Sequence, residues 1–364
     1  MNSFAIYRLP HQQQCTLILQ TSGTPLELSS LTELNQRSGF VVAPFAMDDS
    51  HPLLLIRPDE VKEASLDAFE KYGTFSEKVT HLLRESDALS SRECHTFSEA
   101  RQSYHESFAH FHQRLVAGDF RKLVLSRCLS VPHSGDADPF ALFKTACSLY
   151  PRMFIALAYT PKSGLWLTAT PEILLEGTSD RWCTIALAGT MKLDGDALMG
   201  EGAHSLWSTK NIEEQRVVAS YIADRLKPFA QHVLEEGPRT VRAANLVHLR
   251  SDFTFTLLNN KGVGELLQTL HPTPAVCGLP KEQAFRFILD HEPVPRQYYS
   301  GFMGPLDILQ STHLYVSLRC MQITASQYRL YAGGGLLKDS VEEQEWLETE
   351  AKLETMRSLL NLKS

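Results

Sequence analysis

The chain lacks an excess of basic residues: 35 Lys and Arg face 42 Asp and Glu, which gives a formal net charge of −7 over 364 residues. Proteins that bind nucleic acid usually carry a basic face, so nucleic acid is not an expected partner. No segment approaches the roughly 20 consecutive apolar residues that span a bilayer. The first residues, MNSFAIYRLPHQQQ, also lack the basic and apolar regions of a secretory signal. We therefore expect neither membrane insertion nor export.

Cysteine pairs at metal-binding spacing are lacking too. The seven cysteines are scattered, odd in number and never arranged as Cys-x-x-Cys, which favours reduced thiols over a disulfide or zinc framework. Reduced thiols predict a cytoplasmic protein. Internal repeats and low-complexity tracts are absent, and the 43% hydrophobic and 21% charged fractions are typical of a soluble globular chain.

Helical and strand patterns are both present, without strict alternation between them. Apolar residues at helical spacing predict helices over about 98–117, 203–230, 262–270, 280–290 and 340–361. Runs of β-branched and aromatic residues predict strands over about 122–131, 153–160, 164–177, 183–192, 245–258, 299–307, 313–324 and 327–336. Because consecutive strands joined by short turns pair antiparallel, we expect an α+β fold. Residues 1–95 carry no clear motif, and we separate them from a core over 96–364.

The last predicted helix carries a stripe of charged residues. Glu345, Glu348 and Lys352 are spaced i, i+3 and i+7, so they share one helix face. Such a stripe is usually a solvated face with internal ion pairs. Here, however, the preceding strand runs into three glycines at 333–335, and consecutive glycines let backbone N–H groups approach an anion. On its own, a Gly-Gly-Gly segment is more often a flexible turn.

Other charged residues occupy less ordinary positions. Lys210 and Glu214 are spaced i, i+4 on the long predicted helix, as in a surface ion pair. Carboxylates from the two helices, if they converged, would suit Mg²⁺, which takes oxygen ligands and keeps waters or substrate oxygens in its shell. Lys122, Glu172 and Arg319 lie in or beside apolar strand segments, where an unpartnered buried charge costs several kcal/mol. Any one of them is as readily explained by a solvent-facing position, but three together favour a polar cavity.

Eight ordered segments together resemble the chorismate-utilising enzymes, and within that family most closely the isochorismate synthases. The segments are KLVLSR at 122–127, TPEILL at 170–175, LAGTMK at 187–192, TKNIEEQ at 209–215, LHPTPAVCGLP at 270–280, EPVPRQYYSGFMG at 292–304, LYVSLRC at 314–320 and YAGGGLL with EWLETEAKLETM within 331–356. The resemblance covers about residues 98–361. It implies an α/β sandwich with large antiparallel sheets, helices packed outside, and a site between the sheets.

The resemblance also implies an activity and a cofactor. The implied reaction is the Mg²⁺-dependent, reversible conversion of chorismate to isochorismate, in which water adds at ring C2 and the C4 hydroxyl leaves. The product would feed menaquinone or catechol siderophore synthesis. Chorismate is then the expected small-molecule substrate, and the family resemblance favours a monomer.

Site residues follow from the same resemblance. Lys122 is implied as the general base, with a lowered pKa, and Glu172 as the general acid, with a raised pKa. Glu214 and Glu348 match the magnesium ligands, and Glu345 is expected to contribute to the same shell. The residues implied to hold or border the substrate are Gly189, Thr190, His248, Tyr299, Arg319, Gly333 and Lys352.

Subfamily marks narrow the choice of nucleophile. Ala188 stands where aminodeoxychorismate synthases carry a lysine, and Lys122 stands where ammonia-using relatives usually carry glutamine, so water is implied. Salicylate synthase, which adds pyruvate elimination in the same pocket, shares Lys122 and Glu172 and remains the alternative. A non-catalytic, anion-binding relative is a further alternative. The metal-helix pattern K-D-x-x-E-H is altered at Asn211 and Gln215 but keeps Glu214, so we expect metal binding to persist.

Overall fold

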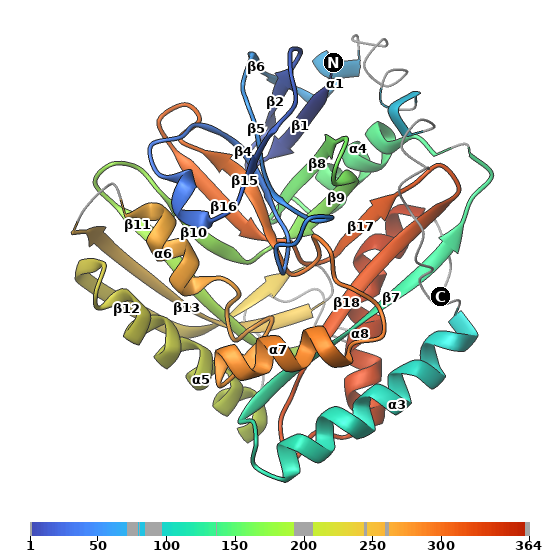
Figure 1. Ribbon diagram of the computed structural model, residues 1–364, viewed down its shortest axis with the longest axis vertical. Helices are drawn as coiled ribbons and strands as arrows, with labels where there is room; N and C mark the ends of the chain where they lie inside the picture. The colour runs from blue at the N-terminus through green and yellow to red at the C-terminus, as the bar shows by residue number, and fades with distance from the viewer. Residues whose placement is uncertain are drawn as a thin grey trace.

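Two antiparallel sheets stacked face to face dominate the computed structural model, which describes residues 2–70, 79, 81–83, 97–135, 137–192, 207–243, 246–258 and 262–360 (Figure 1). Within this part of the chain, each sheet has nine strands. The first sheet has the order β14 (Gly278–Leu279), β7 (Lys122–Pro132), β18 (Gln327–Leu336), β17 (Cys320–Ile323), β9 (Gly164–Thr170), β8 (Phe154–Thr160), β1 (Ser3–Arg8), β2 (Gln14–Gln20) and β6 (Glu60–Ser65). The second has the order β12 (Ala230–Ala243), β13 (Leu246–Leu257), β11 (Trp182–Lys192), β10 (Ile173–Gly177), β16 (Thr312–Val316), β15 (Phe302–Leu306), β4 (Gly39–Ala43), β5 (Leu53–Ile56) and β3 (Leu26–Leu28).

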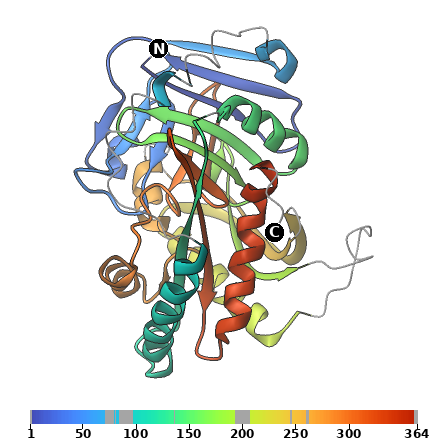
Figure 2. The ribbon, with the colours of Figure 1, turned by 90° about the vertical axis from the view of Figure 1, so that its right-hand side faces the viewer.

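Helices cover the outer faces of both sheets. Their bounds are α1 (Leu66–Glu70), α3 (Phe97–Val116), α4 (Pro139–Leu149), α5 (Thr209–Leu226), α6 (Val263–Leu270), α7 (Lys281–His291) and α8 (Glu342–Arg357), with short 3₁₀ turns η1 (Leu31–Leu34) and η4 (Ser358–Leu360). Apolar residues of α4 and α8 pack on the first sheet, and those of α5 and α6 pack on the second. Helices α3 and α8 run side by side (Figure 2). The predicted α+β sandwich with helices outside is confirmed.

Burial on both faces explains the continuous apolar runs in the central strands. In β8, Phe154, Ala156 and Ala158 belong to the core between the sheets, whereas Ile155 and Leu157 belong to the core beneath the outer helices. Successive side chains of a strand point to opposite faces. A strand covered on both sides therefore reads as an unbroken apolar run rather than an alternating one.

The first 65 residues, which show no motif, complete both sheets. Strand β1 pairs with β8 and leads to β2 and β6, while β4 pairs with β15 and leads to β5 and β3. These strands place no residue in the pocket described below. Their contribution is the shared core between the sheets. The division at residue 95 stays a prediction.

The long predicted helix is shorter than expected. Helix α5 begins at Thr209, where the Ser208 side chain accepts a hydrogen bond from the backbone N–H of Asn211, and ends at Leu226. Residues 203–206 lie outside the described residues. From Ala230 the chain forms the edge strand β12, which the sequence analysis missed. Residues 231–240 are exposed on both faces, so they lack the alternation that signals a strand.

The cysteines correct one expectation. Cys15, Cys147, Cys183, Cys277 and Cys320 carry free thiols, but Cys128 is disulfide-bonded. The prediction that all cysteines are reduced thiols is therefore wrong for Cys128. Sequence spacing alone does not reveal which distant cysteines a fold brings within bonding distance.

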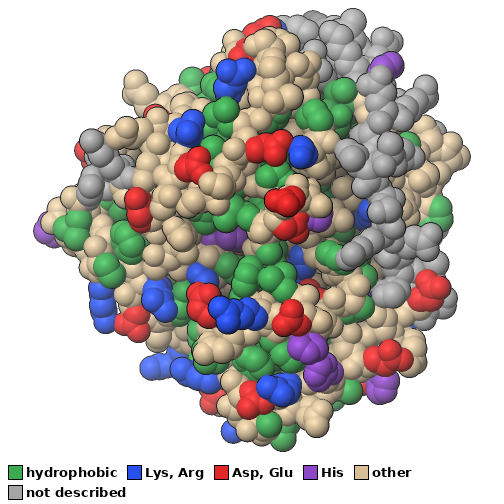
Figure 3. Space-filling view, viewed as in Figure 1, with side chains coloured by type: hydrophobic (Ala, Val, Ile, Leu, Met, Phe, Trp, Pro, Cys, Tyr) green, Lys and Arg blue, Asp and Glu red, His purple; other side chains and the backbone are tan. Residues whose placement is uncertain are grey.

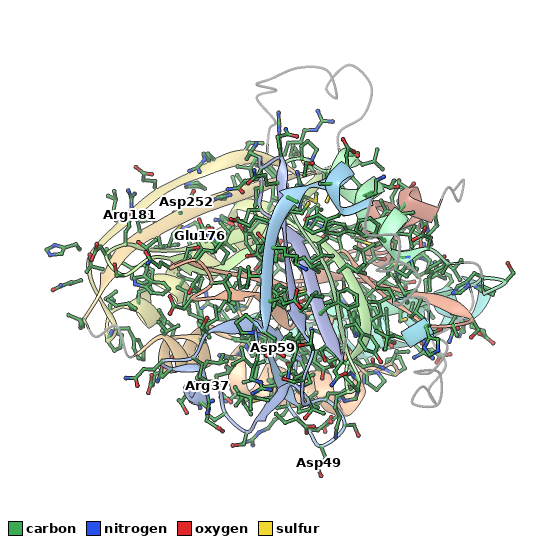
Figure 4. The ribbon with its side chains drawn as sticks, turned by 90° about the horizontal axis from the view of Figure 1, so that it is seen from above. Arg37, Asp49, Asp59, Glu176, Arg181 and Asp252 are labelled. Carbon is green, nitrogen blue, oxygen red and sulfur yellow. The ribbon has the colours of Figure 1, made fainter. Side chains whose placement is uncertain are left out.

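The surface carries charges of both signs. Acidic and basic side chains are interspersed across the face drawn in Figure 3, where the described residues form no single-sign patch. Seen from above (Figure 4), Glu176, Arg181 and Asp252 lie together on the side of the second sheet, and none of them lines the pocket. Among the described helices, none is long and apolar enough to cross a membrane.

Candidate active site

Two polar residues lie where the chain crosses from one sheet to the other. Glu172 connects β9 of the first sheet to β10 of the second, and Arg319 connects β16 of the second to β17 of the first. The crossings are hydrogen-bonded to each other's strands: Val316 N–H donates to the Glu172 carbonyl (2.9 Å), and Ala169 N–H donates to the Arg319 carbonyl (3.1 Å). The strand predicted over 313–324 is therefore two strands, and Arg319 takes a left-handed conformation (φ 40°) at the break.

A pocket opens beside these crossings, between the two sheets. Nine of the predicted site residues line it: Glu172, Gly189, Thr190, Glu214, His248, Tyr299, Arg319, Gly333 and Lys352. The sequence analysis did not single out Ala275, Val276, Leu318 and Tyr331, which also line it. Their place in the sequence could have indicated them, because each lies within or next to one of the eight segments. Their apolar or aromatic side chains, however, suggested no chemical role.

Glu172 is buried in this pocket with a perturbed acidity. Its side chain is 3% exposed. Burial raises the pKa of Glu172 to about 7, although the positive charges of Arg319 and Lys122 act in the opposite direction. The raised pKa agrees with the expectation for a group that must hold a proton near neutral pH.

His248 orients Arg319 across the pocket. Arg319 Nη2 donates a hydrogen bond to His248 Nε2 at 2.7 Å. Burial, with the charge of Arg319, holds the pKa of His248 well below its usual value, so the imidazole is neutral. Its Nδ1–H then faces two acceptors, the Gly189 carbonyl at 3.2 Å and Thr190 Oγ1 at 3.4 Å. The hydrogen bonds of His248 to residues of β11 thus hold its imidazole in place, and the imidazole in turn positions the Arg319 guanidinium.

Three lysine–glutamate ion pairs involve residues of β7, α5 and α8, and of these six residues Glu214 and Lys352 line the pocket. The pairs are Lys122 with Glu214 (Nζ–Oε1 2.8 Å), Lys352 with Glu348 (Nζ–Oε1 2.7 Å) and Lys210 with Glu345. Lys210 therefore does not pair with Glu214 as its i, i+4 spacing suggested; it reaches across to α8. Lys122 is fully buried and does not line the pocket itself, but its partner Glu214 does.

The three glycines at 333–335 form part of strand β18, paired with β7, and not a turn. Two of them make room for site residues. A Cβ at Gly335 would collide with Glu214 Oε1 and lie 2.9 Å from Lys122 Cε, and one at Gly333 would lie 2.7 Å from the Tyr299 hydroxyl. A Cβ at Gly334 would make only ordinary contacts, the nearest at 3.7 Å from Glu345 Oε2. The segment thus brings carboxylates close to the backbone.

The donor chemistry around this strand fits Mg²⁺. Glu214, Glu345 and Glu348 present only carboxylate oxygens, and burial and the charge of Glu348 raise the pKa of Glu345, a repulsion that a cation would relieve. In the part of the chain that is described, no three acidic, histidine or cysteine side chains are close enough to hold a metal together. Mg²⁺ commonly takes one or two carboxylates and fills its shell with waters and substrate oxygens, so this set is compatible with the ion.

Comparisons with known proteins agree with this geometry. The family model described as "Chorismate binding enzyme" matches residues 53–361. The chain is 35% identical over 250 residues to a salicylate biosynthesis isochorismate synthase of Pseudomonas aeruginosa, covering 67% of this chain and 52% of the relative. It is 31% identical over 250 residues to the isochorismate synthase MenF of Escherichia coli, covering 68% and 58%. The matches thus span only half to three fifths of these relatives' length.

Solved structures share the fold. A putative 2,3-dihydroxybenzoate-specific isochorismate synthase, DhbC, from Bacillus anthracis matches with a TM-score of 0.81 at 24% identity, covering all of this chain and 97% of that one. MenF from Escherichia coli, the menaquinone-specific isochorismate synthase, matches with a TM-score of 0.79 at 23% identity, covering 99% of this chain and 89% of that one. At these identities the likeness concerns the fold.

Proposed function

The chain belongs to the chorismate-binding enzyme family, and we propose that it is an isochorismate synthase that converts chorismate reversibly to isochorismate. In this reaction water adds at ring C2 and the C4 hydroxyl leaves. The observation that carries the proposal is the buried carboxyl of Glu172, whose pKa is raised to about 7 in a pocket that also holds Arg319 and an imidazole kept neutral. Such a carboxyl still holds a proton at neutral pH and can give it to a departing hydroxyl.

Substrate carboxylates provide the reason for the cations of the pocket. Arg319 suits the enolpyruvyl carboxylate because its planar fork grips a carboxylate with two hydrogen bonds. Its neighbours Tyr299, Lys352 and the backbone of Gly333 line the same pocket and are assigned to the same carboxylate. Gly189 and Thr190 border the ring carboxylate in this proposal. His248, which holds Arg319, is assigned a place near the leaving hydroxyl.

Lys122 and the carboxylates are assigned to the nucleophile and the metal. In its neutral form Lys122 takes the proton of the attacking water. Its contact with Glu214, which lines the pocket, supports a place beside the reacting ring. Glu214 and Glu348 would hold Mg²⁺, with Glu345 contributing to the same shell through a water. Bound there, the ion would orient the ring carboxylate and offset its charge.

Pathway and product are finer parts of the proposal. We propose that isochorismate passes to menaquinone or catechol siderophore synthesis, since one relative is named menaquinone-specific and another is named specific for 2,3-dihydroxybenzoate, which is a catechol. Salicylate synthase remains the second candidate, favoured by the name of the Pseudomonas aeruginosa relative. A monomer in the cytoplasm completes the proposal, to be checked by light scattering and by cell fractionation.

The deciding experiment is incubation of the purified protein with chorismate, with Mg²⁺ or with EDTA, followed by identification of products by chromatography and mass spectrometry. Isochorismate formed only with the metal supports the whole proposal. Isochorismate formed equally in EDTA keeps the activity and rejects the metal. Salicylate with pyruvate favours the second candidate. If the protein binds chorismate and forms no product, it is an anion-binding relative without this activity.

A further inference from the structure

Gln215, the neighbour of Glu214 on helix α5, is buried against strand β11 with all ends of its amide engaged. Its side chain is 1% exposed. Oε1 accepts a hydrogen bond from the backbone N–H of Ala188 at 2.9 Å. Nε2 donates to the carbonyl of Ala186 at 3.1 Å and to Ser251 Oγ at 3.3 Å. One side chain thus joins the helix that carries Glu214 to two strands of the second sheet.

These contacts lie beside a bulge in β11. The register with β13 shifts between Ala188 and Thr190, so Gly189 has no partner residue on that strand. Gly189 takes a left-handed conformation (φ 68°), and a Cβ there would lie 3.1 Å from the Asn211 carbonyl oxygen of α5. A bulge of this kind re-aims the backbone groups of a strand.

The backbone groups that the bulge re-aims belong to the site. Gly189 N–H donates to Glu214 Oε2 at 3.2 Å, and the Gly189 carbonyl faces His248 Nδ1 at 3.2 Å. The backbone N–H groups of residues 188 and 189 therefore donate to neighbouring side chains of α5: that of Ala188 to Gln215 and that of Gly189 to Glu214. A buried N–H without an acceptor is costly, so the two acceptors of α5 stabilise this bulge over a regular register.

We propose that Gln215 is a positioning residue, which holds the Gly189 bulge in the form that aligns Glu214 on one side and His248 with Arg319 on the other. The inference rests on the proposed function, because it gives Glu214 and Arg319 their roles. It requires a side chain that both accepts and donates at its end: the acceptor meets Ala188 N–H and the donor meets the Ala186 carbonyl. Methionine has the length but neither group, whereas a neutral histidine has one of each.

The test compares Gln215→Met and Gln215→His with a matched packing control. Val218→Ala removes buried volume from the same helix, and an apolar side chain forms no hydrogen bond to the backbone of the bulge; Val218 is 1% exposed in the core of the second sheet. For each variant, four quantities are measured: the melting temperature, kcat and KM for chorismate, Mg²⁺ affinity by calorimetry, and hydrogen exchange of a peptide covering 186–190. Loss of an outer-shell partner typically costs about 10- to 100-fold in metal affinity or activity.

The expected result is a selective loss in Gln215→Met. Its kcat and Mg²⁺ affinity should fall about 10- to 100-fold, with faster exchange over 186–190, while Val218→Ala lowers the melting temperature without these changes. Gln215→His should recover most of the loss. The proposal is overturned if Gln215→Met and Val218→Ala match in kcat, metal affinity and exchange, or if histidine and methionine are equally impaired. A wild-type protein inactive on chorismate would reject the proposed function alone, because exchange and calorimetry still test the positioning role.

Discussion

Two carboxyls that line the pocket have pKa values shifted in opposite directions. Glu172, on the wall made by the sheet crossings, has its pKa raised to about 7 by burial. Glu214, on the wall made by α5 and β18, has a lowered pKa: burial works against ionisation, but the Lys122 ammonium 2.8 Å away more than offsets it. The comparison teaches that burial alone does not set the charge of a carboxyl; a counter-ion in contact does. Glu172 therefore favours its protonated form, whereas Glu214 favours its ionised form.

The largest effect is expected from removing the counter-ion. In Lys122→Met, Glu214 loses its partner and its pKa should rise, as that of Glu172 does. Turnover should fall by about 10²- to 10⁴-fold through loss of the general base. The free energy of unfolding should fall by about 3–5 kcal/mol, the usual cost of breaking a buried ion pair, as measured by denaturant titration. The exposed Lys227 of the same region, changed to Met, serves as the control; a normal kcat in Lys122→Met contradicts the assigned role.

The proposed role of Glu172 as the general acid is tested by Glu172→Gln. Glutamine has a similar shape but no proton to give, so kcat should fall by about 10²- to 10⁴-fold, while the melting temperature should match that of the wild type at pH 4.5, where Glu172 is protonated in the folded protein. In the wild type, kcat should decline as pH rises through about 7, because ionised Glu172 no longer donates. A flat pH profile, or a variant with normal turnover, would move the acid elsewhere.

Stability against pH gives a second reading of Glu172. Its folded pKa of about 7 lies above the ordinary 4.5, so its contribution is complete below pH 4.5 and is lost as pH rises through 7. Relative to Glu172→Gln, the wild type should lose on the order of 3 kcal/mol of unfolding free energy between pH 4.5 and 8. Parallel stability curves for the two proteins would show that Glu172 ionises normally.

The proposed role of Glu214 as a magnesium ligand is tested by comparing Glu214→Ala with Glu213→Ala. The two residues are adjacent on α5, but Glu213 is exposed whereas Glu214 lines the pocket. Glu214→Ala should raise the Mg²⁺ concentration needed for half-maximal activity at least about tenfold, measured by activity against metal concentration. Glu213→Ala should leave it unchanged. Equal responses in the two variants would remove Glu214 from the metal site.

The smallest and most local effect is expected at the glycines of β18. Gly335→Ala places a methyl group against Glu214 and Lys122, whereas Gly334→Ala meets only ordinary contacts. Gly335→Ala should weaken Mg²⁺ activation and turnover by about tenfold through displacement of Glu214, and Gly334→Ala should stay near wild type. Steady-state kinetics of the pair decides this, and equal kinetics would show that the site tolerates a side chain at residue 335.

Much of the fold was predictable from local patterns. Helices near 98–117, 262–270 and 280–290 match α3, α6 and α7 closely, because amphipathic spacing and end signals are carried by neighbouring residues. Strand β12 was missed, since a strand exposed on both faces has no alternation to detect. The break at Arg319 was missed as well, because both halves of 313–324 are apolar and only their different sheets separate them.

The sequence by itself determined most of the helices and strands between residues 98 and 361 and the polar residues that interrupt them, because both properties depend on residues a few positions apart. Only the tertiary structure decided which charges meet. Lys210 pairs with Glu345, 135 residues away, rather than with Glu214 one helical turn along. Glu172 holds its proton because burial raises its pKa, and none of the described lysines forms an ion pair with it as Lys122 does with Glu214. Ion pairing and desolvation depend on distances that the packing of the two sheets sets, and the spacing of residues along the sequence does not reveal those distances.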